Sequence, residues 1–259
     1  MRHSKTLEKI REGKPARMCV LGHNVPAYIQ MAARCGFDCI WLDLEHRLID
    51  DNEVQALLAY SHLANIDILV RSPTTEKTKL YRYLEDGAAG LMIPHVSTVE
   101  KARAMVEAVK FPPIGDRGMD GVGLDADFNL DQNQDEYARH ANQETFLVVQ
   151  IETPLAVENV EAIAAVEGVD CLFFGPGDLG FRLRTTDTGL TLDAAWERTL
   201  AAAKQNGKFV GRPAPTIEML KTFTQQGGQL LAHGSEFSAL KNMLEACAAD
   251  YDEVVGARG

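Results

Sequence analysis

Residues 42–46 read LDLEH and place two carboxylates and a histidine directly behind an apolar run. The interior of a strand excludes charge, so titratable groups gathered at the end of a strand need either solvent or a chemical role. Asp43, Glu45 and His46 are therefore the first candidates for a functional site.

Other apolar runs also end in polar residues, namely Arg71, Gln150, Glu152, Asp178 and Arg212. Two of these, Glu152 and Asp178, would form an oxygen-rich partial coordination sphere. Such a sphere suits Mg²⁺ or Mn²⁺ better than zinc and leaves positions for water and substrate. The glycines of GPGD (175–178), Gly177 among them, let the backbone approach a ligand closely, so amides there could receive an anion.

The elements that must position these residues alternate along the chain. Eight short apolar runs predict strands at 17–21, 38–43, 67–71, 89–94, 146–152, 169–175, 208–212 and 228–234. Between them lie segments of helical periodicity, several opened by Ser, Thr or Asp as an N-cap, at 51–63, 97–109, 153–166, 192–206 and 216–226. The long connection 115–143 contains DEYARHAN (135–142), which could form a short helix of its own.

Strands that alternate with helices pair in parallel, and nearly continuous apolar strands are buried on both faces of their sheet. Eight such units predict a closed (β/α)8 TIM barrel, an α/β fold, as a single domain over residues 1–259. A doubly wound sheet is the alternative, but the first strand is not followed by G-x-G-x-x-G. Catalytic groups of (β/α)8 enzymes gather at the carboxyl ends of the strands, where the polar residues should converge.

Composition excludes several classes of protein. Apolar residues make up 46% of the chain and charged residues 24%, which is ordinary for a globular protein with a substantial core. A net charge of −11 opposes nucleic acid and anionic membranes as partners. We find no secretion signal and no apolar stretch of membrane-spanning length, so we expect a cytoplasmic protein. The five cysteines lack C-x-x-C spacing and are expected to be buried free thiols.

The order of these motifs resembles a known family. LDLEH, Arg71, LEDGAAGLMIPHV, PPIGDRG, VVQIETPLAVENV and VEGVDCLFFGPGDL together resemble the HpcH/HpaI aldolases, metal-dependent class II pyruvate aldolases, over most of residues 17–234. QIET with GPGDL is the most specific part. The resemblance implies a (β/α)8 barrel that assembles as a hexamer. It also implies cleavage of 4-hydroxy-2-oxo acids to pyruvate, or hydroxypyruvate, and an aldehyde, and the reverse reaction.

The resemblance also assigns roles to residues. Glu152 and Asp178 correspond to the ligands of a divalent metal ion, for which we expect Mg²⁺, Mn²⁺ or Co²⁺. Arg71 corresponds to the arginine that holds the keto oxygen and stabilises the enolate. His46 corresponds to the acid–base histidine, and Gln150 to an amide that supports the metal site or holds water. Asp43 and Glu45 are expected to orient or surround these groups.

Two departures from the family pattern leave roles open. Glu85 of LEDGA stands where the family has an aspartate that reaches a neighbouring subunit and pairs with the histidine, and Asp86 is an adjacent alternative. Arg212 stands where many relatives carry aliphatic residues, and it could bind a carboxylate or phosphate of the aldehyde or form a salt bridge at the rim. His95 and His233 are expected to be structural.

Two other functions compete with the aldolase. A related citrate-lyase or malyl-CoA-lyase enzyme would use a similar barrel on thioesters. A non-catalytic barrel would bind a carboxylate metabolite without turnover, and metal-dependent activity separates it from an enzyme.

Overall fold

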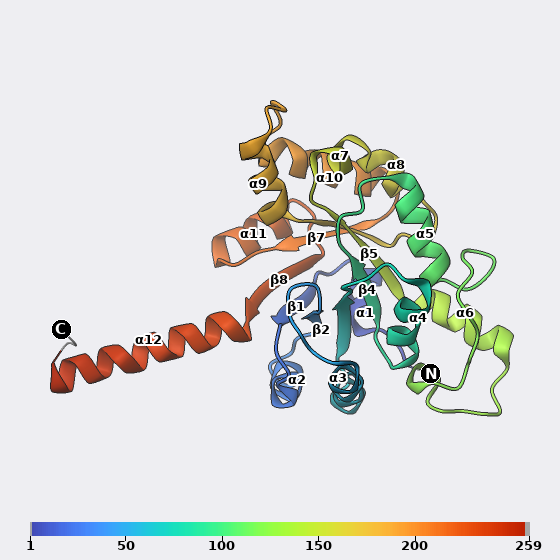
Figure 1. Cartoon of the computed structure of the whole chain (residues 1–259), viewed down its shortest axis with the longest axis horizontal. Helices are drawn as coiled ribbons and strands as arrows, with labels where there is room; N and C mark the ends of the chain where they lie inside the picture. The colour runs from blue at the N-terminus through green and yellow to red at the C-terminus, as the bar shows by residue number, and fades with distance from the viewer. Residues whose placement is uncertain (1, 257–259) are drawn as a thin grey trace.

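The computed structural model describes residues 2–256 and shows a closed barrel of eight strands surrounded by helices (Figure 1). The strands are β1 Ala16–Leu21, β2 Cys39–Asp43, β3 Asp67–Arg71, β4 Gly90–Ile93, β5 Phe146–Ile151, β6 Cys171–Phe174, β7 Phe209–Pro213 and β8 Leu230–Ser235. Each strand pairs in parallel with the next, and β8 pairs with β1. The predicted (β/α)8 barrel is confirmed, and each predicted run overlaps one strand.

Alternate residues of each strand face the barrel interior, as the two-residue period of a strand requires. The interior core includes Met18, Trp41, Leu69, Val148 and Phe173. Residues of the other parity pack between the strands and the helices, among them Ile40, Leu42, Val70, Val149 and Leu172. Asp43, Arg71, Gln150 and Glu152 continue the interior series at even spacing, so parity brings all four to the inside of the carboxyl rim.

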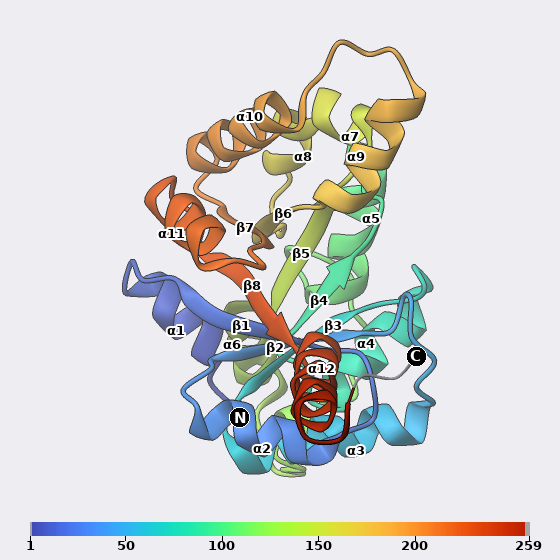
Figure 2. The same cartoon turned by 90° about the vertical axis from the view of Figure 1, so that its left-hand side faces the viewer.

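The helices lie outside the strands (Figure 2). They are α1 Lys5–Arg11, α2 Pro26–Arg34, α3 Asp51–Ala64, α4 Lys77–Glu85, α5 Val99–Val109, α6 Gln134–Glu144, α7 Pro154–Glu158, α8 Val160–Ala164, α9 Pro176–Thr185, α10 Leu192–Gln205, α11 Ile217–Gln225 and α12 Glu236–Val255. The expected N-caps are present, since Asp50, Thr98, Thr153, Thr191 and Thr216 accept N–H groups of the first turn.

One predicted helix is interrupted. Residues 153–166 form two short helices, α7 and α8, because Asn159 ends the first with backbone angles of φ −99° and ψ 6°. Its side-chain amide donates to the Ser97 carbonyl at 2.8 Å. This bond ties the break to the connection that follows β4.

The amino end of the barrel is closed by the N-terminal segment. Leu7 of α1 packs into the interior core, and the buried Asp67 carboxylate accepts hydrogen bonds from the Ser4 hydroxyl and the Thr6 amide. A ligand that reaches the interior polar residues must therefore enter at the carboxyl rim.

The long connection between α5 and β5 is ordered by a small polar cluster. It contains a 3₁₀ turn at Leu124–Ala126 and then α6, which confirms the helix predicted in DEYARHAN. The Asp125 carboxylate accepts from Arg117 at 2.9 Å and from the Tyr137 hydroxyl at 2.6 Å. These bonds join distant parts of the connection to one another, and its 3₁₀ turn contacts α4.

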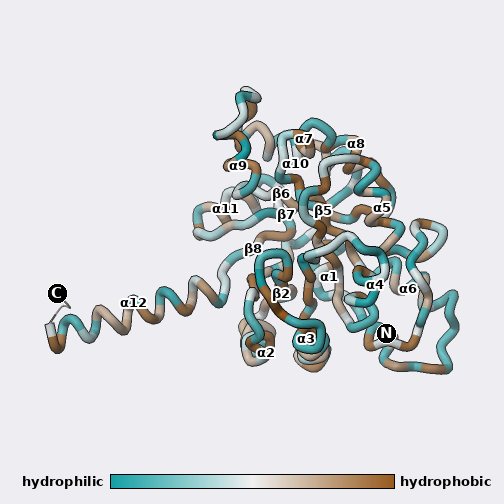
Figure 3. Tube along the Cα trace, in the orientation of Figure 1, coloured by the Kyte–Doolittle hydropathy of each residue, from teal (hydrophilic) through white to brown (hydrophobic). Residues whose placement is uncertain are grey.

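The last helix, α12, points away from the barrel (Figures 1 and 2). Polar and apolar residues alternate along α12 (Figure 3). Exposed apolar and thiol side chains recur at alternating spacings of three and four residues, at Phe237, Leu240, Leu244, Cys247, Tyr251 and Val254. Such a stripe along one face of a helix normally packs against a partner.

The cysteine prediction is only partly correct. Cys19, Cys39 and Cys171 lie on strands and are buried, whereas Cys35 and Cys247 are exposed because they lie at the end of α2 and on α12. Within residues 2–256 no helix is both long and apolar enough to cross a membrane.

Candidate active site at the carboxyl rim

Arg71 is fixed by two acids, Asp43 at the end of β2 and Glu45 just after it. Its Nε and Nη2 donate to the two Asp43 carboxylate oxygens at 2.9 and 2.6 Å, and its Nη1 lies 3.0 Å from Glu45 Oε2. Its guanidinium also lies over the Trp41 ring, 4.8 Å from the centroid. Burial alone would raise the pKa of Asp43, but Arg71 outweighs it and holds the pKa below its usual value. Arg71 is thus a rigid buried cation.

His46 stands beside this pair on the solvent side. Its Nε2 lies 3.4 Å from Glu45 Oε2, and its backbone N–H donates to Asp43 Oδ1 at 3.3 Å. The side chain is 53% exposed, so a substrate or a neighbouring subunit can reach the ring. Asp43 and Glu45 thus surround both Arg71 and His46, as the sequence analysis expected of them.

Glu152 is the most buried acid of the rim, with 3% of its side chain exposed. Its Oε1 accepts the His95 backbone N–H at 2.7 Å, and its Oε2 accepts the Gln150 amide at 3.1 Å. Burial raises the pKa of Glu152 despite the help of His95, and the nearby acids Glu45 and Asp178 raise it further. The charge of Glu152 is therefore only partly compensated by protein groups.

Asp178 lies in the first turn of α9, immediately after β6. Its carboxylate accepts from Arg182, one helical turn later, at 2.8 Å, and its side chain is 43% exposed. The end of β6 lies close to Glu152, which follows β5. Only a glycine fits at position 175, because a Cβ there would lie 2.6 Å from both Cβ and Oε2 of Glu152. At Gly177 a Cβ would meet no atom within 4 Å, so this turn of the helix faces open space.

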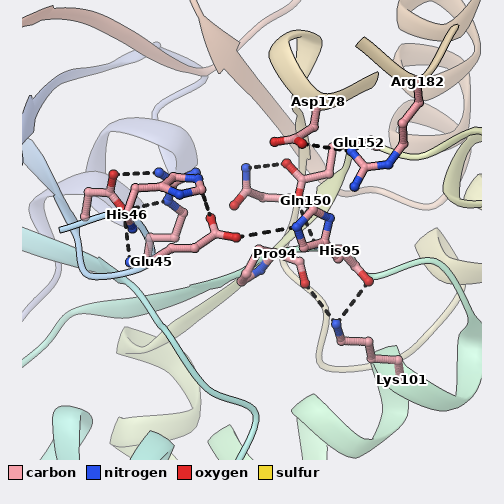
Figure 4. A network of polar contacts seen from close by, with 11 residues as sticks. Glu45, His46, Pro94, His95, Lys101, Gln150, Glu152, Asp178 and Arg182 are labelled. Atoms are coloured by element: carbon pink, nitrogen blue, oxygen red, sulfur yellow. Dashed lines mark hydrogen bonds and ion pairs between the residues drawn. The ribbon is translucent and has the colours of Figure 1, made fainter. Parts of the chain in front are cut away.

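Three residues that the sequence did not assign to the site lie within it (Figure 4). The His95 ring lies between two acids, with Nδ1 3.2 Å from Glu152 Oε1 and Nε2 3.5 Å from Glu45 Oε1. The Lys101 ammonium donates to the Pro94 and His95 carbonyls, each at 3.0 Å. Arg182 is the third. The i,i+4 spacing of Asp178 and Arg182 is the only sequence signal that could have indicated any of them.

Glu152 and Asp178 fit a divalent cation. Both present carboxylate oxygens, and a cation would compensate the buried charge of Glu152. Gln150 Oε1 is buried and accepts no hydrogen bond from residues 2–256, so it could hold a water molecule beside such a cation. No group of three or more His, Cys, Asp or Glu placed to hold a metal ion occurs in the described residues. A cation here would be completed by water or substrate.

Glu85 does not meet His46 within one chain. Helices run antiparallel to the strands of a barrel, so the end of α4 lies at the closed amino end, beside the Arg117–Asp125 cluster. Burial raises the pKa of Glu85 to about 7, against the effect of Arg117, and Asp125, Asp120 and Asp86 add to the rise. Asp86 accepts from Gln55 at 2.8 Å at the same end of the barrel.

The structure corrects the prediction for Arg212. Gly211 pairs with Phe173 and shares its interior parity, so Arg212 faces outward, into the layer between β7 and the helices. Its guanidinium lies 3.7, 4.7 and 4.9 Å from the ring centroids of Phe223, Trp196 and Phe174. Burial lowers the pKa of Arg212 to about 10. Arg212 therefore points away from the rim where it was expected to bind a ligand, and within residues 2–256 it has no salt bridge, which was the alternative.

His233 has a contact that suits its expected structural role. Its Nδ1 lies 2.6 Å from the Ala214 carbonyl oxygen, which ties β8 to the residue after β7. His95, for which a structural role was also expected, instead lies within the acid network.

Comparisons with known proteins show the family to which the chain belongs. A profile of the family described as HpcH/HpaI aldolase/citrate lyase matches residues 17–242. The chain is 32% identical over 251 residues to the hydroxypyruvate/pyruvate aldolase of Deinococcus radiodurans, a match that covers 93% of this chain and 87% of that protein. It is 33% identical over 219 residues to the 5-keto-4-deoxy-D-glucarate aldolase of Salmonella paratyphi C, with 83% and 84% covered.

The crystal structure of an HpcH/HpaI aldolase from Desulfitobacterium hafniense superposes on the barrel with a TM-score of 0.89. The two chains are 29% identical, and the superposition covers 98% of each.

Proposed function

Because the chain belongs to the HpcH/HpaI aldolase/citrate lyase family, we propose that it is a divalent-metal-dependent class II aldolase. It cleaves a 4-hydroxy-2-oxo acid to pyruvate, or hydroxypyruvate, and an aldehyde, and catalyses the reverse reaction. One observation carries the proposal: a clamped buried arginine, an exposed histidine and two carboxylates face the same open end of the barrel.

In this proposal, residues on two sides of the rim bind different parts of the substrate and the metal ion. Asp43 and Glu45 occupy three of the five N–H donors of Arg71, so the guanidinium cannot turn and its remaining donors meet the 2-oxo group. Uncapped N–H groups in the first turn of α9, next to Gly177, receive the carboxylate of the oxo acid. Glu152 and Asp178 hold the metal ion, and Gln150 keeps Glu152 in place.

The bond cleavage follows from these positions. His46 takes the proton of the 4-hydroxyl, the C3–C4 bond breaks, and the aldehyde leaves. The electron pair of that bond forms an enolate, whose oxygen is stabilised by Arg71. The proton taken by His46 returns to C3 and gives pyruvate. When bound, a divalent cation supplies Lewis-acid stabilisation of the charge that develops on the oxo acid.

The alternatives are weaker. The relatives that are 32% and 33% identical to the chain are named hydroxypyruvate/pyruvate aldolase and 5-keto-4-deoxy-D-glucarate aldolase, which supports an aldolase over an enzyme that acts on thioesters. The alternative of a non-catalytic barrel does not explain why two acids hold an arginine at a rim that is open to solvent.

We also propose that the protein is a homo-oligomer, which the family resemblance sets as a hexamer. In a (β/α)8 barrel the eighth helix covers β8 and β1, but α12 leaves this face. A groove of about 760 Å³ remains there, lined by residues that include Arg17, Phe37, Leu220 and Leu231. The apolar stripe of α12 from a second copy fits this groove. Glu85, at the amino end of its own barrel, is then available to a neighbour's His46.

The test is a synthesis screen of the purified protein with pyruvate or hydroxypyruvate, a panel of aldehydes, and Mg²⁺, Mn²⁺ or Co²⁺. We expect a 4-hydroxy-2-oxo acid, detected by NMR, in the metal-loaded samples. Cleavage of a malyl-CoA thioester without any aldol product would instead establish the thioester reaction.

A further inference from the structure

A second polar cluster lies on the opposite side of the rim from Glu152. We call it the His23 cluster, and it consists of Gly22, His23, Arg47, Glu236 and Phe237. In a closed barrel of eight strands, β1 and β5 are four strands apart in either direction, so the end of β1 faces the end of β5 across the mouth. None of these residues has a part in the reaction described above.

The centre of the cluster is a histidine–carboxylate pair. Glu236, in the first turn of α12, is only 6% exposed. Its Oε1 accepts the Gly22 backbone N–H at 2.7 Å and lies 2.8 Å from His23 Nδ1. The Glu236 carboxylate is therefore held by the Gly22 N–H, and it fixes the orientation of the imidazole. The His23 side chain is 47% exposed. The His23 ring also stacks on Phe237, with centroids 5.3 Å apart and an interplanar angle of 20°.

Arg47 brings a positive charge to this pair. Its guanidinium lies 5.5 Å from the Phe237 ring centroid, and its Nη1 donates to the His46 carbonyl at 2.9 Å. A Cβ at Gly22 would lie 3.1 Å from Arg47 Cγ, so the glycine gives this side chain room. Within residues 2–256 no carboxylate lies within ion-pair distance of Arg47, and most of its donors remain available to a ligand.

The position of the cluster relative to the reaction indicates which ligand it takes. In the proposed reaction, Arg71, Glu152 and Asp178 hold the oxo acid near the ends of β3, β5 and β6. His46 then lies beside the C3–C4 bond that breaks. The aldehyde half must then extend toward β8, β1 and β2, where Arg47 and His23 lie. Arg212, from which such a contact was expected, faces away from the mouth.

We infer that Arg47 and His23 bind an acidic group at the far end of the aldehyde partner, such as a carboxylate or a phosphate. A guanidinium binds an oxyanion through two parallel N–H bonds. An imidazole held between a buried carboxylate and a bound oxyanion donates from both ring nitrogens. This inference rests on the proposed function, because it assigns the second substrate of the same site.

Two matched pairs of aldehydes test it in carboligation with pyruvate. Succinic semialdehyde is compared with its neutral amide, and glyceraldehyde 3-phosphate with glyceraldehyde. The measured quantity is the ratio of kcat/KM for the acidic member to kcat/KM for the neutral one. We expect wild type to favour the acidic member of at least one pair, which also identifies the acid. Arg47→Gln should lower that ratio by about 10- to 100-fold, the value of a charge-assisted bond.

Three further variants test whether the change in the ratio is specific to Arg47 and His23. Arg47→Lys should retain part of the ratio, and His23→Gln should lower it. Arg139→Gln removes the same charge from an exposed position on α6 and should leave the ratio at its wild-type value. A ratio near one in wild type, or a wild-type ratio in Arg47→Gln, would overturn the inference while the aldolase proposal stands. Absence of any aldol product from wild type would overturn the proposed function instead.

Discussion

The guanidinium of Arg71 is held by both oxygens of the Asp43 carboxylate, at 2.9 Å from Nε and 2.6 Å from Nη2. The two residues are 28 positions apart in sequence and pair directly in the register of β2 and β3. Asp43 therefore fixes the orientation of Arg71, and we propose that it acts as a positioning residue.

The first prediction concerns this pair. Arg71→Ala should lower aldol turnover by about 10²–10³, the usual loss when one donor to a developing oxyanion is removed. Asp43→Asn should lower it less, and the double variant should be no worse than Arg71→Ala alone, because Asp43 has nothing left to orient. Asp131→Asn, which removes an exposed charge in the long connection, is the control. Losses that simply add in the double variant would mean that Asp43 acts independently of Arg71.

A second prediction separates the roles of Arg71 and His46. In the proposed mechanism Arg71 stabilises the enolate in any reaction of the oxo acid, so Arg71→Ala should slow cleavage and the deuterium exchange of pyruvate methyl protons alike. His46→Ala should lower cleavage by about 10²–10⁴ but exchange by less, because a divalent cation held by Glu152 and Asp178 would acidify the methyl protons of pyruvate and water could then accept them. The ratio of exchange to cleavage, measured by NMR, should therefore rise only in His46→Ala. Wild-type cleavage in His46→Ala would make this histidine structural.

Much of this site follows from the sequence because it depends on local order. Each strand of a parallel barrel delivers its end to the same rim, so Arg71, Gln150 and Glu152 converge whatever the details of packing. The prediction for Arg212 was wrong because its position at the end of a strand does not determine whether its side chain faces the barrel interior or the helices. The side-chain parity of β7 depends on its register with β6, where Phe173 lies beside Gly211.

The contacts missed from the sequence are those that join distant segments. His23 and Glu236 are 213 positions apart and meet only because β8 closes on β1. His95 reaches Glu152 from a left-handed backbone conformation, with φ 54°, that its residue type does not predict. The course of α12 away from the barrel likewise cannot be derived from its amphipathic pattern, which is equally compatible with packing on its own barrel.

A third prediction tests the proposed assembly. If Glu85 completes the site of a neighbouring subunit, neither His46→Ala nor Glu85→Ala homo-oligomers should be fully active. Oligomers reassembled from both variants should regain part of the activity, because some sites then receive both intact groups. Light scattering should show that the active form is larger than a monomer. A fully active monomer would refute the shared site.

The fourth prediction concerns Glu85 and stability. Its folded pKa of about 7 exceeds the ordinary value of 4.5, so the folded chain binds this proton more tightly than the unfolded chain. The contribution of Glu85 to stability should therefore fall as pH rises from about 4.5 to about 7, and Glu85→Gln should raise Tm at about pH 8 but not at about pH 4. Glu107→Gln, on the exposed face of α5, is the control. Equal Tm shifts at both pH values would mean that the proton on Glu85 is not the cause.

The most direct measurement of the central claim is the exchange of pyruvate methyl protons with deuterated water, followed by NMR. The account predicts that wild type catalyses this exchange with Mg²⁺ bound, that EDTA abolishes it, and that added Mg²⁺ restores it, while Glu152→Gln stays near background. Burial lowers the pKa of Lys101, whose ammonium reaches the same network, so this lysine is the one to examine for a Schiff base. Undiminished exchange in the chelated enzyme, with pyruvate trapped on Lys101 by borohydride, would contradict the account.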